Sequence, residues 1–324
     1  MKQHIYNRYV GGYGSLLGKL NLSSRSWFLL LSLAFIWGAS FYFIEIGLVH
    51  LDPFWLVSTR LLFGSLPLGL WLLTQQKVLP MTFRFWSSVM IMGVINNFLP
   101  FNFIAFGQLF VTGGMASIIN ANTAFMGVIV SGIFLSNEPA TWNRVVGVFI
   151  GVAGVAIAIG VTPALLTADT SNLFVGSLAI VLATVAYAFA GVWGKLKLSE
   201  YSSTQSAVGM LICSSAVAVL CSFLISGPPS LAIISYPLDL IQVALGLGVL
   251  GTALAYPLYF RILEVAGSSN LMLVTIIVPV FAIILDALML NQFVSRADLF
   301  GFTLVAVGLL VMDGRLNNYF FKRN

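Results

Sequence analysis

The feature that most constrains this chain is a series of apolar runs, each about 20 residues long, that occupies most of its 324 positions. A helix needs about 20 apolar residues to cross the roughly 30 Å of hydrocarbon in a lipid bilayer. Only 8% of the residues are charged, whereas a soluble domain carries roughly 25%. The runs therefore predict an all-α polytopic membrane protein and leave no room for a folded domain outside the membrane.

Ten transmembrane helices can be placed between short connections that contain turn residues, such as Asp52-Pro53 and Gly227-Pro228-Pro229. The predicted spans cover residues 27–49, 54–74, 85–109, 114–136, 142–161, 173–194, 205–226, 240–263, 268–290 and 297–313. The first run is longer than the 7–15 apolar residues of a signal peptide. We therefore interpret it as an uncleaved first helix.

The second half of the chain repeats the first at an offset of 154 residues. This offset relates Val111-Thr112-Gly113-Gly114 to Val265-Ala266-Gly267-Ser268, and each run ends one apolar helix and opens another. It also relates Glu138 to Gln292, Gly147 to Gly301 and Gly154 to Gly308. Each copy has five spans, an odd number, so the second copy must lie inverted in the membrane. Two inverted five-helix repeats are typical of secondary transporters that bind substrate between the repeats near mid-membrane.

The predicted organisation has five parts. An N-terminal cytoplasmic tail (1–26) precedes the first repeat (27–161), and an external linker (162–172) leads to the second repeat (173–313) and a C-terminal cytoplasmic tail (314–324).

Basic residues predict the orientation of the helices. With the N-terminus in the cytoplasm, thirteen of the 15 Lys and Arg fall on the cytoplasmic side, Arg296 falls on the opposite side and Arg60 lies within a span. This asymmetry follows the positive-inside rule and places both termini in the cytoplasm. We expect a location in a bacterial cytoplasmic membrane. The net charge of +5 lies at span ends, so we expect no nucleic-acid partner.

Short motifs along the chain resemble those of the drug/metabolite transporter superfamily, of the EamA type. The motifs are Ile36–Phe41 in the first span, Thr59–Leu62 in the second, Asn96–Phe101 in the third, Asn137–Pro139 after the fourth, and Thr252–Tyr256 with Tyr259–Arg261 in the eighth. The resemblance runs from Trp27 to Asp313. It implies a ten-helix carrier of small organic metabolites or drugs, often an exporter. The second repeat departs from the pattern, with Asn291-Gln292 where the first has Asn137-Glu138.

Polar residues within the spans are candidates for a substrate cavity, because polar groups are costly in hydrocarbon. Asn97, Phe101 and Gln108 share one face of the third span at helical spacing. In the fourth span we favour Asn120 over Asn122 as the cavity residue. The alternative is that these amides hold helices together.

The second repeat should supply matching residues. Hydroxyl and aromatic side chains in both repeats would form an aromatic box suited to amphipathic solutes, including amino acids with apolar side chains. The candidates are Trp37, Ser40, Tyr187, Thr252, Tyr256 and Thr275.

Charged residues in the spans allow one gating hypothesis. Glu45 and Arg60 lie near the same outer end of the first two spans, and an ion pair between them could hold an outer gate. The alternative is two independent residues that extend to the interface. For Asp286 we favour exposure at the interface over a role in proton relay.

The sequence thus predicts an exporter of small organic metabolites that works by alternating access. The alternatives are a carrier of phosphorylated metabolites or nucleotide sugars, which would need more basic residues in its cavity, and a membrane-embedded enzyme. No catalytic, metal-binding or cofactor-binding motif is recognisable, so we expect no enzyme activity, metal or cofactor. Expected partners are the lipid bilayer and a small-molecule substrate. The expected oligomeric state is a monomer or a homodimer. Gly147 and Gly151 allow close contact between helices, and we favour contact between helices of one chain.

Overall fold

The structure is a computed structural model that describes residues 23–74, 78–135, 141–160, 171–229 and 234–314. Regular structure in these segments is helical throughout. Glu138, one of the residues that define the repeat, lies outside the described residues.

The first half of the described chain makes five helical crossings, in which η marks a π-helical stretch. They are α2 (Ser24–Leu48); α3 (Pro53–Thr74); α4 (Phe83–Gly93), η1 (Val94–Phe98) and α5 (Leu99–Gly107); α6 (Gly113–Asn120) and α7 (Thr123–Phe134); and α8 (Trp142–Ile159).

The second half makes five more. They are α9 (Ser171–Trp193) with η3 (Gly194–Leu198); α10 (Ser203–Ser226); α11 (Pro237–Ile241), η5 (Gln242–Leu254) and α12 (Ala255–Ala266); α13 (Ser268–Leu285) with η6 (Asp286–Leu290); and α14 (Arg296–Met312).

Nine of these crossings are long and apolar enough to span a membrane. The tenth, α14, has 17 residues and is about 26 Å long at 1.5 Å per residue. The structure therefore confirms the all-α membrane fold, with ten helical crossings in the described part of the chain. The predicted linker 162–172 and the two tails lie largely outside that part, so their boundaries stay predictions.

Local side-chain chemistry defines several helix ends. Thr112 Oγ1 accepts a hydrogen bond from the Met115 N–H and so caps α6, and Ser295 and Asp298 form a capping box at the start of α14. Such caps satisfy N–H groups that have no partner within the helix. They explain why α6 and α14 begin within one residue of the predicted positions.

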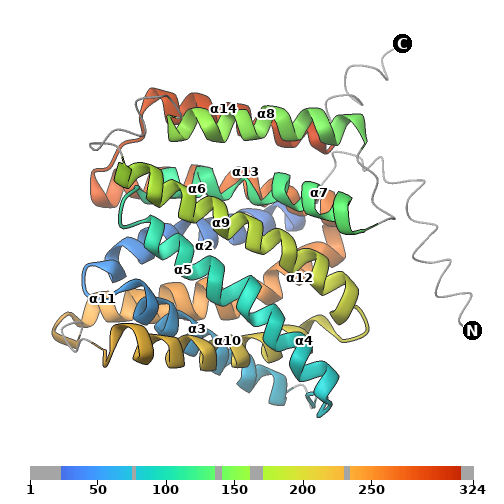
Figure 1. Ribbon diagram of the computed structural model, residues 1–324, viewed down its shortest axis with the longest axis vertical. Coiled ribbons are helices and arrows are strands. Elements are labelled where there is room, and N and C mark those ends of the chain that lie inside the picture. Colours follow the sequence, from blue (N-terminus) through green and yellow to red (C-terminus); the bar gives the residue numbers. More distant parts are fainter. Residues whose placement is uncertain (1–22, 75–77, 136–140, 161–170, 230–233, 315–324) are drawn as a thin grey trace, which may run out of the picture.

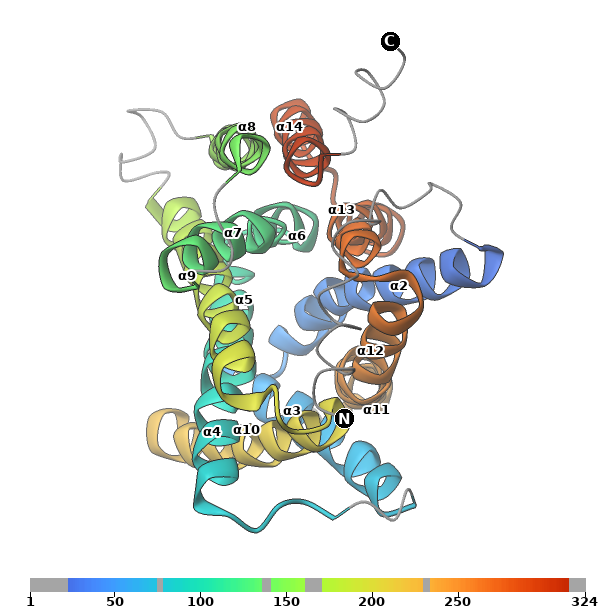
Figure 2. The ribbon, with the colours of Figure 1, turned by 90° about the vertical axis from the view of Figure 1, so that its right-hand side faces the viewer.

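The helices lie side by side and run in similar directions across the view of Figure 1. Seen along the helix axes, α9 with α5 and α4 forms one side of the bundle, while α13, α2 and α12 form the other (Figure 2). In this view the pair α3 and α10 lies at one edge of the bundle. The pair α8 and α14 packs at the opposite edge.

Contacts between the two halves follow a pseudo-twofold pattern. Helix α2, the first crossing, packs against α13, the ninth, and its counterpart α9, the sixth, packs against α6 and α7 of the fourth. Likewise α3 packs against η5, and its counterpart α10 packs against α4 and η1. These contacts between the repeats thus come in symmetry-related pairs, as inverted repeats require. A site between the repeats will therefore take side chains from both halves.

The glycines that repeat at the 154-residue offset meet across this axis. A Cβ atom at Gly154 would lie 2.6 Å from the carbonyl oxygen of Gly301, and one at Gly301 would lie 2.5 Å from the carbonyl oxygen of Gly154. The same reciprocal approach joins Gly147 to Gly308. Small residues allow such close backbone contact. These glycines therefore pack α8 against α14 within one chain.

Candidate functional site

A hydrogen-bonded network joins the two repeats where the third crossing meets the seventh and eighth. The Tyr256 hydroxyl donates to Asn97 Oδ1 at 2.8 Å, while Asn96 Nδ2 lies 3.1 Å from Asn97 Oδ1 and 3.2 Å from the Tyr256 oxygen. Asn97 is fully buried, and its Nδ2 donates to Ser214 Oγ at 3.2 Å. Because an unpaired amide in a bilayer costs several kcal/mol, these bonds explain how two adjacent asparagines are tolerated.

Arg60 lies beside this network on the second crossing and is only 7% exposed. Its Nε donates to Thr252 Oγ1 at 3.2 Å, and its Nη2 lies 3.5 Å from the carbonyl oxygen of Gly251. The guanidinium carbon stands 3.8 Å from the centre of the Phe101 ring. The π-helical turn of η5 lets the Thr252 hydroxyl donate to Leu247 O at 2.9 Å, five residues earlier, while it accepts from Arg60.

A second group of polar residues gathers at the N-terminus of α6, and we call it the Glu45 cluster. The N–H of Gly113 donates to Glu45 Oε1, and the N–H of Gly114 donates to Asp286 Oδ2. Gln292 Nε2 donates to Glu45 Oε2 at 2.9 Å. Carboxylates are stabilised at a helix N-terminus, where free N–H groups and the helix dipole meet them. The cluster joins α2 and α6 of the first repeat to η6 and the following turn of the second.

The structure corrects the gating prediction. Glu45 and Arg60, both described, form no ion pair with each other, because Glu45 is held by the α6 N-terminus while Arg60 packs on Phe101. The predicted exposure of Asp286 is also wrong, since it is 2% exposed. Gln108 is buried and donates to the Phe41 carbonyl oxygen at 2.9 Å. Its side chain therefore contacts α2 and is not part of the Asn97 network.

Aromatic side chains border the Arg60 region. Tyr187 and Tyr256 lie in the neighbourhood of Arg60, and Trp37 lies 6.0 Å from Tyr259 between ring centres. All four aromatic residues are half-buried. Tyr187 of the sixth crossing and Tyr256 of the eighth thus bring aromatic side chains of the second repeat near Arg60 of the first.

The remaining predicted residues divide between the interior and helix contacts. The Ser40 hydroxyl is buried and donates to a carbonyl one turn earlier in its own helix, while Thr275 is half-buried on α13. Asn122 is buried and donates to Thr184 Oγ1 at 3.3 Å, so it joins the fourth crossing to the sixth. Asn120 is half-buried, and its Oδ1 has no partner among the described residues. Its role as a cavity residue stays a prediction.

The two symmetry-related turns after the third and eighth crossings are packed differently. A Cβ atom at Gly113 would lie 3.1 Å from each carboxylate oxygen of Asp286 and 3.2 Å from Phe41 Cβ. A Cβ atom at Gly267, the counterpart of Gly113, would meet nothing within 4 Å. Five crossings separate these turns, so they lie at opposite ends of the bundle. At the Glu45 end of the bundle the Gly113 turn is therefore closely packed, whereas at the other end a side chain at Gly267 would extend into open space.

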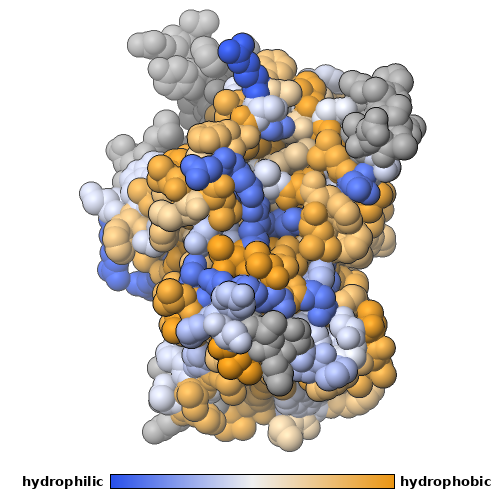
Figure 3. Space-filling model, turned by 90° about the vertical axis from the view of Figure 1, so that its left-hand side faces the viewer, coloured by the Kyte–Doolittle hydropathy of each residue, from blue (hydrophilic) through white to orange (hydrophobic). Residues whose placement is uncertain are grey.

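Hydrophilic side chains form a band across the middle of the face shown in Figure 3, between apolar regions above and below it.

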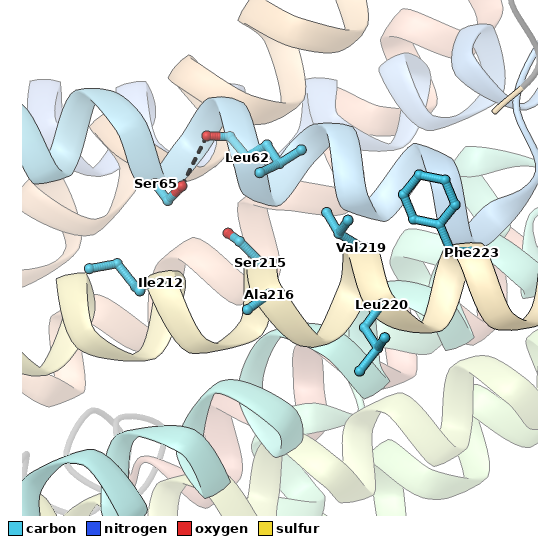
Figure 4. Close-up of a pocket in the computed structure, with 8 residues that line it drawn as sticks. All are labelled: Leu62, Ser65, Ile212, Ser215, Ala216, Val219, Leu220 and Phe223. Carbon is cyan, nitrogen blue, oxygen red and sulfur yellow. Dashed lines mark hydrogen bonds between the residues drawn. The ribbon is translucent and has the colours of Figure 1, made fainter. Parts of the chain in front are cut away.

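Apolar grooves lie elsewhere. One runs between α3 and α10 and is lined by Leu62, Ser65, Ile212, Ser215, Ala216, Val219, Leu220 and Phe223 (Figure 4). Its leucines and Phe223 are exposed in the middle of membrane-spanning helices, so it faces lipid. None of the predicted binding residues lines it.

Sequence reasoning missed four residues that take part in these two polar groups. Asn96 was part of a motif but was not assigned to the site, although its neighbour Asn97 was. Ser214 lies in a span of small residues with no periodic signal. The donor N–H groups of Gly113 and Gly114 are backbone atoms, and only the repeated Gly-containing turn pointed to them.

Comparison with known proteins identifies the family. The sequence pattern of the EamA-like transporter family matches residues 25–160 and again 174–312, which together make up most of the chain. The chain belongs to the EamA-like transporter family. The two matches coincide with the two halves related by the 154-residue offset.

Similar proteins share nearly full length with the chain. The uncharacterized transporter YoaV of Bacillus subtilis is 23% identical over 91% of this chain and 97% of its own length. A protein of Salmonella typhimurium named "Probable amino-acid metabolite efflux pump" is 23% identical over 90% of this chain and 95% of its own length. A crystal structure that is 19% identical covers 91% of this chain and 99% of that one with a TM-score of 0.61, which supports the fold.

Proposed function

We propose that this family member exports small amphipathic metabolites, with amino-acid-like solutes as its substrate class. The observation that carries the proposal is a pair of neighbouring polar contacts, Asn97 with Tyr256 and Arg60 with Thr252. Each contact joins the two repeats within the helical bundle. Amide, hydroxyl and guanidinium groups beside half-buried aromatic rings can bind a solute that is polar at one end and apolar at the other.

Alternating access is supported by the unequal packing of the two ends. The turn at Gly113 is packed against Asp286, whereas its counterpart at Gly267 is open. In an inverted-repeat carrier, one repeat moves against the other and exchanges which end is closed. We assign the Glu45 end to the outside, as the distribution of basic residues predicts. The structure then corresponds to a state that is closed to the outside.

Two further observations support export of amino-acid-like solutes from a bacterial cytoplasm. Relatives in Salmonella typhimurium and Escherichia coli carry the name "Probable amino-acid metabolite efflux pump". Half-buried aromatic residues also lie near Arg60, as an apolar side chain of the solute would require.

The alternatives have less support. A phosphorylated substrate would need several cations, and Arg60 is the buried cation of the described helices. A membrane-embedded enzyme would need a nucleophile with its base or a set of metal ligands. The described residues hold no group of three or more His, Cys, Asp or Glu placed to bind a metal ion. A channel would differ from a carrier by lacking saturable counterflow.

The test compares the culture medium of cells that overproduce the chain with that of cells that overproduce Asn97→Ala or Trp37→Ala. Thr303→Ala, an exposed hydroxyl on α14, serves as the matched control. Untargeted mass spectrometry should find solutes enriched by the unmodified chain and the control, and less so by the two site variants. If the unmodified chain enriches no solute in the medium, the exporter proposal is refuted. If the site variants enrich the same solutes to the same level at equal amounts of protein in the membrane, the proposed site is refuted.

A further inference from the structure

Arg60 is a buried cation that has no partner of opposite charge among the described residues. Eight of the ten acidic residues are described, all except Glu138 and Asp169. None of the eight forms a salt bridge with Arg60. Of its five N–H donors, one contacts Thr252 and one lies at 3.5 Å from a backbone carbonyl. A buried ion with so few compensating contacts costs several kcal/mol. Charged residues inside a membrane bundle are for this reason usually functional.

The contacts of Arg60 hold the guanidinium plane in place without neutralising it. Phe101 stacks at 3.8 Å, and Thr252 accepts from Nε, which leaves Nη1 without a partner among the described residues. Tyr187 and Tyr256, which lie near Arg60, are half-buried. A group that reaches Arg60 from the side of these rings meets an oriented fork of N–H donors next to aromatic side chains. That fork matches the two oxygens of a carboxylate.

We propose that Arg60 binds the carboxylate of the transported solute. The assignment rests on the proposed function and narrows its substrate class to monocarboxylates with an apolar or aromatic side chain. One guanidinium balances one carboxylate, whereas a phosphate dianion would keep an uncompensated charge. The Asn97–Tyr256 network lies next to the guanidinium and offers amide and hydroxyl groups to further polar atoms of the solute.

The first test measures export by Arg60→Gln and Arg60→Lys, with Thr303→Ala as control, in the same culture-medium comparison. The unmodified chain should enrich solutes that carry a carboxylate. Both Arg60 variants should reduce the enrichment of these solutes at least about tenfold. Glutamine has no positive charge, and lysine cannot reproduce the planar guanidinium on Phe101. Exported solutes that lack a carboxylate would overturn the proposal, as would phosphorylated solutes or full export by Arg60→Gln. Enrichment of nothing by the unmodified chain would instead refute the exporter itself, and the carboxylate assignment with it.

A second measurement separates a binding role from a structural one. The purified full chain and Arg60→Met are heated in detergent without solute, and then with L-phenylalanine, phenylpropionate, phenylethylamine or phenyl phosphate. Removal of an uncompensated buried charge should leave the melting temperature of the empty protein unchanged or raise it. The two carboxylates should raise the melting temperature of the unmodified chain more than phenylethylamine or phenyl phosphate does, and Arg60→Met should lose this difference. A large drop in the melting temperature of empty Arg60→Met would refute the proposal, as would equal effects of all four probes.

Discussion

Replacement of Gly154 by alanine should force α8 and α14 apart. The added Cβ would lie 2.6 Å from Gly301 O and 2.8 Å from both Leu304 Cβ and Val305 N. Ordinary contact begins near 3.4 Å, so the helices must separate by about 0.8 Å at this point. Overpacking of this kind costs about 1–3 kcal/mol. We therefore expect Gly154→Ala to lower the free energy of unfolding by this amount, measured by reversible denaturation in detergent.

The matched control is Gly127→Ala on α7, where an added Cβ would meet nothing within 4 Å. Alanine is favoured over glycine within a helix by about 0.5–1 kcal/mol, so this variant should be no less stable than the unmodified chain. Gly301→Ala should cost about as much as Gly154→Ala, because the two contacts are reciprocal. The double variant should cost less than the sum, since one separation relieves both contacts. Equal stability of Gly154→Ala and Gly127→Ala would refute the reasoning.

Two further changes test the polar groups. Gln292→Glu places a carboxylate where an amide now donates to Glu45, so like-charge repulsion should open the Glu45 end. In a variant without the two native cysteines, Val111→Cys, buried at this end, should then react several-fold faster with an impermeant maleimide, and an unchanged rate would argue against the gate. Tyr256→Phe removes the donor to Asn97 and leaves a buried acceptor less satisfied, at a cost of about 1–3 kcal/mol. Its export should fall about tenfold, and normal export would exclude the network from the site.

The fold could be predicted because length and hydropathy decide it. Helix α13 with η6 spans residues 268–290, as predicted, since only an apolar run of that length can cross the bilayer. The repeat offset relates the contact of Gly154 with Gly301 to that of Gly147 with Gly308, but the offset alone does not say which glycines meet. Individual side-chain partners could not be predicted in this way. Glu45 and Arg60 share an outer half of the membrane by sequence position, but the rotation of α2 and α3 within the bundle directs them to different neighbours.

The burial of polar side chains was predictable where chemistry forbids lipid exposure, and uncertain where two polar neighbours compete. Asn97 and Thr252 are buried, as expected of amide and hydroxyl groups that need partners deep in a span, while their role in binding substrate stays a prediction. Asp286 was misjudged because its depth was counted along one helix, whereas its burial comes from the N-terminus of α6. Sequence position along one span does not report which other crossing covers it.

The Glu45 cluster has no chemical counterpart at the other end of the bundle. The 154-residue offset that relates the two halves places Ser199 at the position of Glu45 and Gly132 at that of Asp286. The arrangement of helices is thus nearly symmetric, but the side-chain contacts that close the two ends of the bundle differ. Each 1.4 kcal/mol by which one closed state is favoured changes its resting population tenfold. In the proposed alternating-access cycle, the empty protein would therefore rest mostly with one end closed, and solute would reach it mainly from the open side.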